Sequence, residues 1–263
     1  MVVSQPRPFL VAGHPRSGTT VLTRLLNTHP EVEATFEMGA FERLDTPYPE
    51  YRRSLRLGFR DRPVRSVGAG TPRARAWSSR RFAGEFRYRL WRRRGGVIGL
   101  ETVADLLSRT LRRRWVGDKL PRYVFELDDL APREGLGRIV IVRDCRHVTA
   151  STLARVRTAW SGRSWTERLD TPAKVAANWV RAVESVERNL SQVHVVRFED
   201  LIDDPRRCVE GIAAYLDVDA AVFDTSLIRR PDSKPDQLLD PSGRAAVEEV
   251  AGEAMRRWGY EGA

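Results

Sequence analysis

The 263-residue sequence contains only two cysteines, Cys145 and Cys208, and no C-x-x-C pair. This scarcity excludes a disulfide framework and a cysteine zinc site, so we expect a cytoplasmic protein. Long apolar runs are missing as well: the longest aliphatic run covers residues 139–142, whereas a membrane span needs roughly 18 residues. The first 13 residues hold two prolines and no long apolar core. We therefore expect neither a signal peptide nor a transmembrane anchor.

Lysine is also rare, because 42 of the 45 basic residues are arginine and only Lys119, Lys174 and Lys234 are lysine. The formal net charge of +10 is unevenly spread: residues 51–94 carry +13 and the rest of the chain carries −3. A biased genome composition is one explanation for the arginine excess. The functional alternative is an arginine-rich surface for an anionic partner.

The length fits one large α/β domain better than two. With no internal repeat and no clean linker, we treat residues 1–263 as a single domain. Residues 45–75 are rich in Pro, Gly, Arg and Ser and are predicted to be irregular, and residues 79–94 are predicted to form a strongly basic helix. We place a variable acceptor-side or lid segment at about residues 45–100.

Short apolar runs alternate with segments of helical spacing. Strands are predicted at residues 9–12, 33–36, 115–116, 138–142 and 193–198. Helices are predicted at residues 19–27, 101–114, 144–156, 172–190, 205–216 and 245–258. Strands that alternate with helices predict a three-layer α/β fold, with a central parallel sheet flanked by helices.

A glycine-rich loop joins the first predicted strand to the first helix. Residues 13–20 read GHPRSGTT, so Gly13 and Gly18 have the spacing of a P-loop. Thr19 stands where an ATPase needs lysine, and Arg16 supplies a cation from within the loop. Backbone N–H groups at a helix N-terminus suit a phosphate. The pattern indicates a P-loop-like fold without the usual Mg-bound triphosphate; the alternative is a glycine-rich turn with no ligand.

Two motifs resemble those of sulfotransferases that use 3′-phosphoadenosine 5′-phosphosulfate (PAPS). PRSGTT at residues 15–20 resembles their 5′-phosphosulfate loop, and the tyrosylprotein group and its bacterial relatives are closer than the cytosolic steroid and phenol enzymes. RDCRHVTAS at residues 143–151 resembles the family's 3′-phosphate element, R-D-P-R-D-x-x-x-S, with Cys145 and His147 as departures. The resemblance implies PAPS as co-substrate, 3′,5′-ADP as product and no metal.

The resemblance also assigns residues to the donor nucleotide. They are Arg16, Ser17, Gly18, Thr19, Thr20, Arg143 and Ser151, with Arg229 and Arg230 as 3′-phosphate contacts from a basic tail. For the tail, a solvated loop is the alternative. For Arg143, the alternative is an ion pair with Asp144 or Glu199. Glu199 itself lies in a segment, residues 196–201, that resembles a structural element of the family, and we do not expect it to be catalytic.

Catalytic roles follow from the resemblance in the same way. Glu37 falls where the tyrosylprotein group has its catalytic base, with Glu33 as the fallback and a role at a helix N-terminus as the structural alternative. Lys119 resembles the family's strand-end lysine, which together with Arg16 would stabilise the leaving phosphate. The structural alternative for Lys119 is an ion pair with Asp118.

The leading hypothesis is therefore a sulfotransferase that acts on a hydroxyl of an unidentified small molecule, glycan or lipid, giving a sulfate ester. The arginine excess favours an anionic acceptor. A P-loop kinase of small metabolites is the second hypothesis, and the missing loop lysine opposes it. The third is a non-catalytic module that binds anions or nucleic acid; it leaves two phosphate motifs unexplained, and we expect no nucleic-acid partner.

Overall fold

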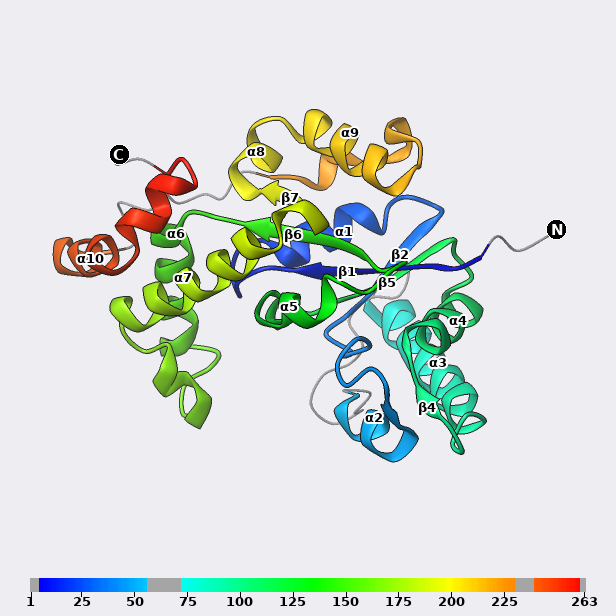
Figure 1. Ribbon diagram of the computed structural model, residues 1–263. Coiled ribbons are helices and arrows are strands. Elements are labelled where there is room, and N and C mark those ends of the chain that lie inside the picture. The colour runs from blue at the N-terminus through cyan, green and yellow to red at the C-terminus, as the bar shows by residue number, and fades with distance from the viewer. Residues whose placement is uncertain (1–4, 56–71, 230–238, 261–263) are drawn as a thin grey trace.

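Five parallel strands form the central sheet of the computed structural model, which describes residues 5–55, 72–229 and 239–260. Their order across the sheet is β2 (Val32–Phe36), β5 (Trp115–Lys119), β1 (Arg7–Ala12), β6 (Gly137–Val142) and β7 (His194–Arg197) (Figure 1). Because the strands are parallel, their carboxyl ends share one edge of the sheet, and the loops that carry chemistry are gathered there. The predicted three-layer α/β fold is confirmed.

Strand β1 is buried on both faces. Leu10 and Ala12 pack into one core cluster, whereas Phe9 and Val11 pack into another. Side chains of a strand alternate between faces, so a continuous apolar run at this position predicts helices on both sides of the sheet.

The helices divide between the two faces and one end of the sheet. One face is covered by α1 (Thr19–Leu26), α8 (Phe198–Asp203) and α9 (Pro205–Leu216). The other is covered by α3 (Pro72–Trp91), α4 (Leu100–Leu111), α5 (Leu127–Leu130) and α7 (Pro172–Arg188). At one end of the molecule, α6 (Cys145–Arg157) and α10 (Pro241–Arg257) pack with α7 (Figure 1).

Smaller elements complete the fold. A two-stranded antiparallel pair joins β3 (Thr46–Pro47) to β4 (Val97–Ile98), and α2 (Tyr48–Ser54) follows β3. The 3-10 helices are η1 (Pro121–Glu126), η2 (Ser164–Arg168), η3 (Leu190–Gln192), η4 (Ala220–Val222) and η5 (Thr225–Leu227). Among the described residues, no helix has the length and apolar character needed to cross a membrane.

The prediction that residues 45–75 are irregular is wrong where α2 forms and again from Pro72, where α3 begins ahead of the predicted helix at residues 79–94. Proline lies in the first turn of α2, where its missing N–H costs nothing and its fixed φ favours the helix. Tyr51 anchors α2: its ring is fully buried and its hydroxyl donates a 2.7 Å hydrogen bond to the carbonyl oxygen of Ala40. Residues 56–71 lie outside the described residues.

Candidate active site

The glycine-rich loop leads from the carboxyl end of β1 into α1. Gly13 has a φ of 151° and Gly18 a φ of 98°. A Cβ atom on Gly13 would lie 2.4 Å from the carbonyl oxygen of Ile141, and one on Gly18 would lie 2.4 Å from the ring of Phe198. Glycine is therefore required at both positions, because the loop lies directly against β6 and α8.

The start of α1 is open to an anion. Gly18 is the N-cap residue, and no side chain caps the first N–H groups of the helix. Unpaired N–H groups and the positive end of the helix dipole favour a phosphate or sulfate group at this point. Ser17 adds a hydroxyl, since its buried Oγ has no hydrogen-bond partner within the described part of the chain.

The two predicted phosphate elements meet in space. Arg16, which has a φ of 76°, donates a hydrogen bond of 2.9 Å from Nε to the hydroxyl of Ser151 on α6. Arg143 follows β6 and donates from Nη1 to the carbonyl oxygen of Arg16 at 3.3 Å. The guanidinium of Arg143 also lies 4.2 Å from the ring centroid of Phe198, so one aromatic ring supports both Arg143 and the glycine loop.

Three guanidinium groups converge here. Burial lowers the pKa of Arg16, and the charge of Arg155 lowers it further. Burial likewise lowers the pKa of Arg143; the charge of Glu199 opposes this shift, and that of Arg16 adds to it. Arg155 was not among the residues predicted from the sequence. Its position four residues after Ser151 puts it on the same face of α6, which is the signal that could have identified it.

Two buried donor atoms near the glycine-rich loop lack a hydrogen-bond partner among the described residues. Arg143 Nε is buried and, like Ser17 Oγ, has no hydrogen-bond partner among the residues described. Buried polar atoms are normally paired, so these donors have capacity for a ligand. Ser17 belongs to the loop before α1 and Arg143 to the loop before α6, and these loops follow the neighbouring strands β1 and β6.

Lys119 and Glu37 form an ion pair beside the glycine loop. Lys119 is the last residue of β5, and its Nζ lies 3.0 Å from Oε1 of Glu37 and 3.4 Å from Oγ1 of Thr20. The Lys119 side chain is 3% exposed and that of Glu37 is 30% exposed. The cation is thus buried beside the loop, while the carboxylate is partly exposed.

The turn that carries Glu37 is held by Asp118. Glu37 has a φ of 57°, and its N–H donates to the carbonyl oxygen of Lys119 at 2.6 Å. Asp118 is fully buried and points away from Lys119, so the alternative of an ion pair between these two residues is wrong. Its carboxylate accepts hydrogen bonds from the N–H groups of Met38, Gly39 and Ala40 and from the hydroxyls of Thr35 and Tyr123.

Glu33, the fallback base, lies far from this pair along β2. The strand register sets Glu33 beside Val116 and Phe36 beside Lys119, so Glu33 belongs to the amino-terminal half of the sheet. Its carboxylate lies 3.5 Å from Arg113, and burial raises its pKa. Because Glu37 lies beside Lys119 and Glu33 does not, the structure favours Glu37 as the candidate base.

Three of the four histidines, His14, His29 and His194, make structural contacts. His14 is buried within the glycine loop, where Nδ1 lies 2.7 Å from the carbonyl oxygen of Pro15 and Nε2 lies 2.9 Å from Oδ1 of Asn178. Burial lowers the pKa of His14 to about 4, so its ring is neutral near pH 7. His29 packs against the ring of Phe223, and His194 packs against that of Tyr215.

Glu199 is a structural carboxylate, as the sequence suggested. It accepts a hydrogen bond from the N–H of Asp144 at 3.1 Å and another from the hydroxyl of Tyr260 at 3.0 Å. Burial raises the pKa of Glu199. The residue therefore connects the loop that carries Arg143 to the end of α10. Asp144 itself pairs with Arg146 at 2.6 Å, so the ion pair considered between Arg143 and Asp144 is not the contact that forms.

Two of the residues predicted to bind the donor, Arg229 and Arg230, lie where a described part of the chain ends. Arg229 is exposed and follows η5, a short helix that packs on α1. Arg230 lies outside the described residues, and the expected 3′-phosphate contacts of Arg229 and Arg230 stay a prediction. No cluster of three or more His, Cys, Asp or Glu side chains suited to a metal is found in the described ranges.

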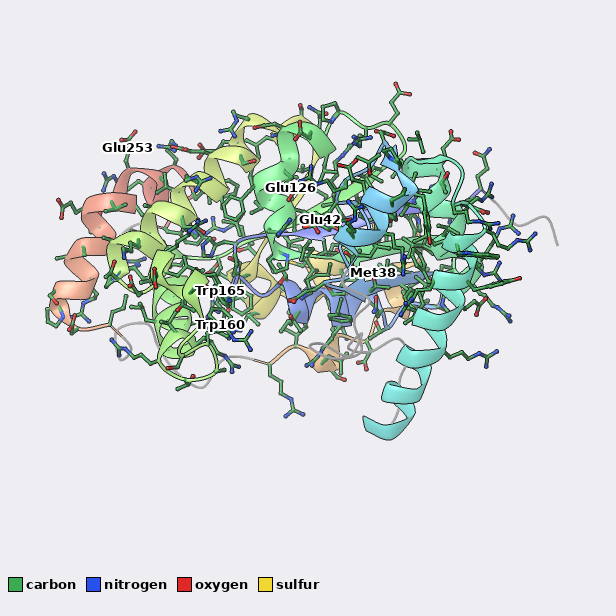
Figure 2. All side chains as sticks on the ribbon, turned by 90° about the horizontal axis from the view of Figure 1, so that it is seen from below. Met38, Glu42, Glu126, Trp160, Trp165 and Glu253 are labelled. Carbon is green, nitrogen blue, oxygen red and sulfur yellow. The ribbon has the colours of Figure 1, made fainter. Side chains whose placement is uncertain are left out.

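Figure 2 labels residues from several of the segments around the sheet. Met38 and Glu42 lie in the segment after Glu37, near Glu126 of η1. Trp160 and Trp165 lie together in the segment after α6, with ring centroids 5.1 Å apart. Helix α3 lies at the opposite end of the molecule from α10 in both figures.

Comparisons with known proteins agree with this geometry. A family model described as the sulfotransferase family matches residues 8–222. The fold resembles the sulfotransferase domain of the Synechococcus PCC 7002 olefin synthase, with a TM-score of 0.62, 19% identity and coverage of 100% of this chain and 98% of that one. Sulfotransferase STF9 from Mycobacterium avium gives a TM-score of 0.56 at 17% identity, covering 98% of this chain and 78% of that one.

A mouse sulfotransferase complexed with PAP is also similar, with a TM-score of 0.50, 16% identity and coverage of 96% of this chain and 85% of that one. At such identities these likenesses establish the fold alone. No curated protein sequence matches the chain.

Proposed function

The chain belongs to the sulfotransferase family, and on this premise we propose that it transfers a sulfuryl group from PAPS to a hydroxyl group of an acceptor. The observation that carries the proposal is the position of Lys119, whose Nζ lies within 3.4 Å of both Glu37 and Thr20. A carboxylate, a buried cation and a hydroxyl at the start of α1 are thereby gathered at one point. These are the groups that sulfuryl transfer requires: a base, a charge stabiliser and a holder of the transferred group.

The donor-binding part of the proposal rests on the meeting of the two phosphate elements. The open N-terminus of α1 with Ser17, Thr19 and Thr20 would hold the 5′-phosphosulfate. Ser151 and the guanidinium groups of Arg143 and Arg155 would hold the 3′-phosphate, while Arg16 keeps its predicted role at the leaving 5′-phosphate. The fold-related mouse enzyme was crystallised with PAP, the 3′,5′-ADP that remains after transfer.

The proposed chemistry uses Glu37 as the general base. Its carboxylate accepts the proton of the acceptor hydroxyl while the hydroxyl oxygen forms a bond to sulfur. The bond between sulfur and the bridging oxygen of the 5′-phosphate breaks, and its electron pair stays on that oxygen. Lys119 and Arg16 stabilise the charge that develops there, so the products are a sulfate ester and 3′,5′-ADP.

Isothermal titration calorimetry with 3′,5′-ADP, ADP and ATP, each with and without Mg²⁺, tests the donor site. We expect tight binding of 3′,5′-ADP that needs no Mg²⁺, and loss of its advantage over ADP in the Arg143→Ala variant. Arg206→Ala, on the exposed start of α9, is the matched control and should bind like the wild type. Equal binding of ADP, or a requirement for Mg²⁺, would refute the proposal and favour a kinase.

The acceptor is proposed only as a hydroxyl compound. Glu37 is partly exposed and lies on the carboxyl edge of the sheet, so the acceptor hydroxyl must reach that edge. A screen of phenols, sugars and hydroxylated lipids with ³⁵S-labelled PAPS tests each class. Label transfer that is lost in Glu37→Gln would identify an acceptor of this site.

A further inference from the structure

The last turns of α3 and the link to β4 form a surface that the proposed chemistry does not use. We name it the basic tip and define it as Arg87, Tyr88, Trp91, Arg92, Arg94 and Val97. All six residues are exposed. Tyr88, Trp91 and Val97 are 59%, 48% and 60% exposed, which is unusual for large apolar side chains that alternate with arginines.

The basic tip lies away from the candidate active site. Arg93, next to it, lines a groove together with Pro6, Pro8 and Gly135, which lie at the amino ends of β1 and β6. Glu37, Lys119 and the glycine loop lie at the carboxyl ends of the strands. A partner on the basic tip would therefore leave the active site open, and the tip is not placed to contact an acceptor there.

Positive charge on this part of the molecule is far from balanced. Residues 81–114 contain ten arginines and three carboxylates; two of the arginines, Arg113 and Arg114, pair with carboxylates outside this segment, which are Glu33, Glu31 and Asp217. Asp105 pairs with both Arg93 and Arg109, and Glu85 pairs with Arg89, which uses two of the three carboxylates. Within the described residues, Arg87 and Arg92 have no carboxylate partner. Such a surplus favours a partner that carries negative charge.

The apolar side chains of the basic tip indicate which kind of anionic partner fits it. Tyr88 and Trp91 stack with ring centroids 6.4 Å apart, and the guanidinium of Arg94 lies 4.1 Å from the centroid of Trp91. One face of the indole is thus already covered, and less of it is free to stack on a nucleic-acid base. Val97 has no ring to stack at all. Trp, Tyr and an aliphatic side chain among arginines are instead the groups that enter the interface of a bilayer.

We propose that the basic tip docks the protein on the surface of an anionic lipid bilayer. The arginines would contact lipid phosphates, and Trp91 with Val97 would insert at the level of the headgroups. This attachment is peripheral and needs no membrane-spanning helix. It is independent of the acceptor, because the active site faces the other edge of the sheet.

Vesicle sedimentation with the full chain tests the proposal. The probes are phosphatidylcholine vesicles and vesicles with 30% phosphatidylglycerol, each at low and at high salt. We expect binding to the anionic vesicles only, with a loss at high salt, and at least tenfold weaker binding of R92E/R94E. Trp91→Ala leaves the charge of the protein unchanged and should still weaken its binding to anionic vesicles severalfold.

The matched control is R206E/R207E, which makes the same change of charge on the exposed start of α9. It should bind vesicles like the wild type, and all variants should keep their melting temperature and their affinity for 3′,5′-ADP. No binding to anionic vesicles at low salt, or equal losses in both double variants, would overturn the proposal. Displacement of the protein from vesicles by equimolar single-stranded RNA would overturn it in favour of a nucleic-acid surface.

Discussion

Arg16 Nε donates a hydrogen bond of 2.9 Å to the hydroxyl of Ser151, although 135 residues separate the two in the chain. Arg16 belongs to the loop before α1 and Ser151 to helix α6, so this contact joins the two phosphate elements directly. A change at either residue should therefore affect binding of the phosphate assigned to the other.

Arg155 gives the sharpest test of the 3′-phosphate site. We expect Arg155→Ala to weaken binding of 3′,5′-ADP by about 10- to 100-fold, because a charged hydrogen bond contributes about 1.5–3 kcal/mol. Affinity for ADP, which has no 3′-phosphate, should stay unchanged. Arg157→Ala, two residues further on α6 and also exposed, is the control. If ADP and 3′,5′-ADP lose affinity equally, Arg155 does not contact the 3′-phosphate.

Replacement of Glu37 tests its role as the general base without changing the residues assigned to the donor. We expect Glu37→Gln to lower the turnover number by about 10²–10⁴-fold, the usual contribution of a general base. Binding of 3′,5′-ADP should remain, since Glu37 is not assigned to the donor. Glu33→Gln is the matched control and should keep its activity. Loss of activity in Glu33→Gln alone would assign the base to the other end of β2.

Asp118 should be important for stability. Its carboxylate is fully buried and accepts five hydrogen bonds, three of them from the backbone that follows Glu37. Asp118→Asn replaces one acceptor oxygen by a donor among groups that also donate, so we expect a loss of about 3 kcal/mol in unfolding free energy. Urea denaturation measures it.

Asp128→Asn is the comparison, because Asp128 is an exposed carboxylate paired with Arg188. Surface ion pairs contribute about 0–1 kcal/mol, so this variant should unfold almost like the wild type. Similar losses in the two variants would mean that the buried network around Asp118 adds little.

His14 should give the protein a specific sensitivity to acid. Burial lowers its pKa to about 4 in the folded chain, whereas an unfolded histidine titrates near ~6.5. Between these values the unfolded chain binds the extra proton. The contribution of His14 is therefore complete above about pH 6.5 and is lost as the pH falls towards 4, to a total of about 3 kcal/mol.

The measurement is urea denaturation of the wild type and His14→Gln at several pH values. The stability difference between them should shrink as the pH falls from 7 to 4, because the variant has no group to protonate at this position. A constant difference across this range would show that His14 does not titrate differently on folding.

Local signals made much of the fold and of the glycine loop predictable. The spacing of Gly13 and Gly18 and the apolar run before them depend on a few neighbouring residues, and the structure has the predicted strand, loop and helix. Helix α2 was missed because a segment rich in proline resembles a loop by composition. Proline nevertheless favours a helix when it lies in the first turn.

The parts of the site that were not predicted depend on tertiary packing. Asp118 and Lys119 are adjacent in sequence and were considered as an ion pair. Adjacent side chains of a strand point to opposite faces, so Lys119 meets Glu37 while Asp118 faces the turn after β2. The charge of Arg155 acts on Arg16 because α6 packs beside the loop. In the sequence, only the spacing of four residues from Ser151 indicated this.

The ion pair between Lys119 and Glu37 has a kinetic consequence under the proposed function. In the ligand-free protein, Lys119, which would contact the donor, is paired with Glu37, which would deprotonate the acceptor. An anionic donor that enters next to Thr20 competes for Lys119 and frees Glu37 to accept a proton. The enzyme should then follow a compulsory order, in which donor precedes acceptor, and should protect itself from unproductive acceptor complexes when the donor is scarce.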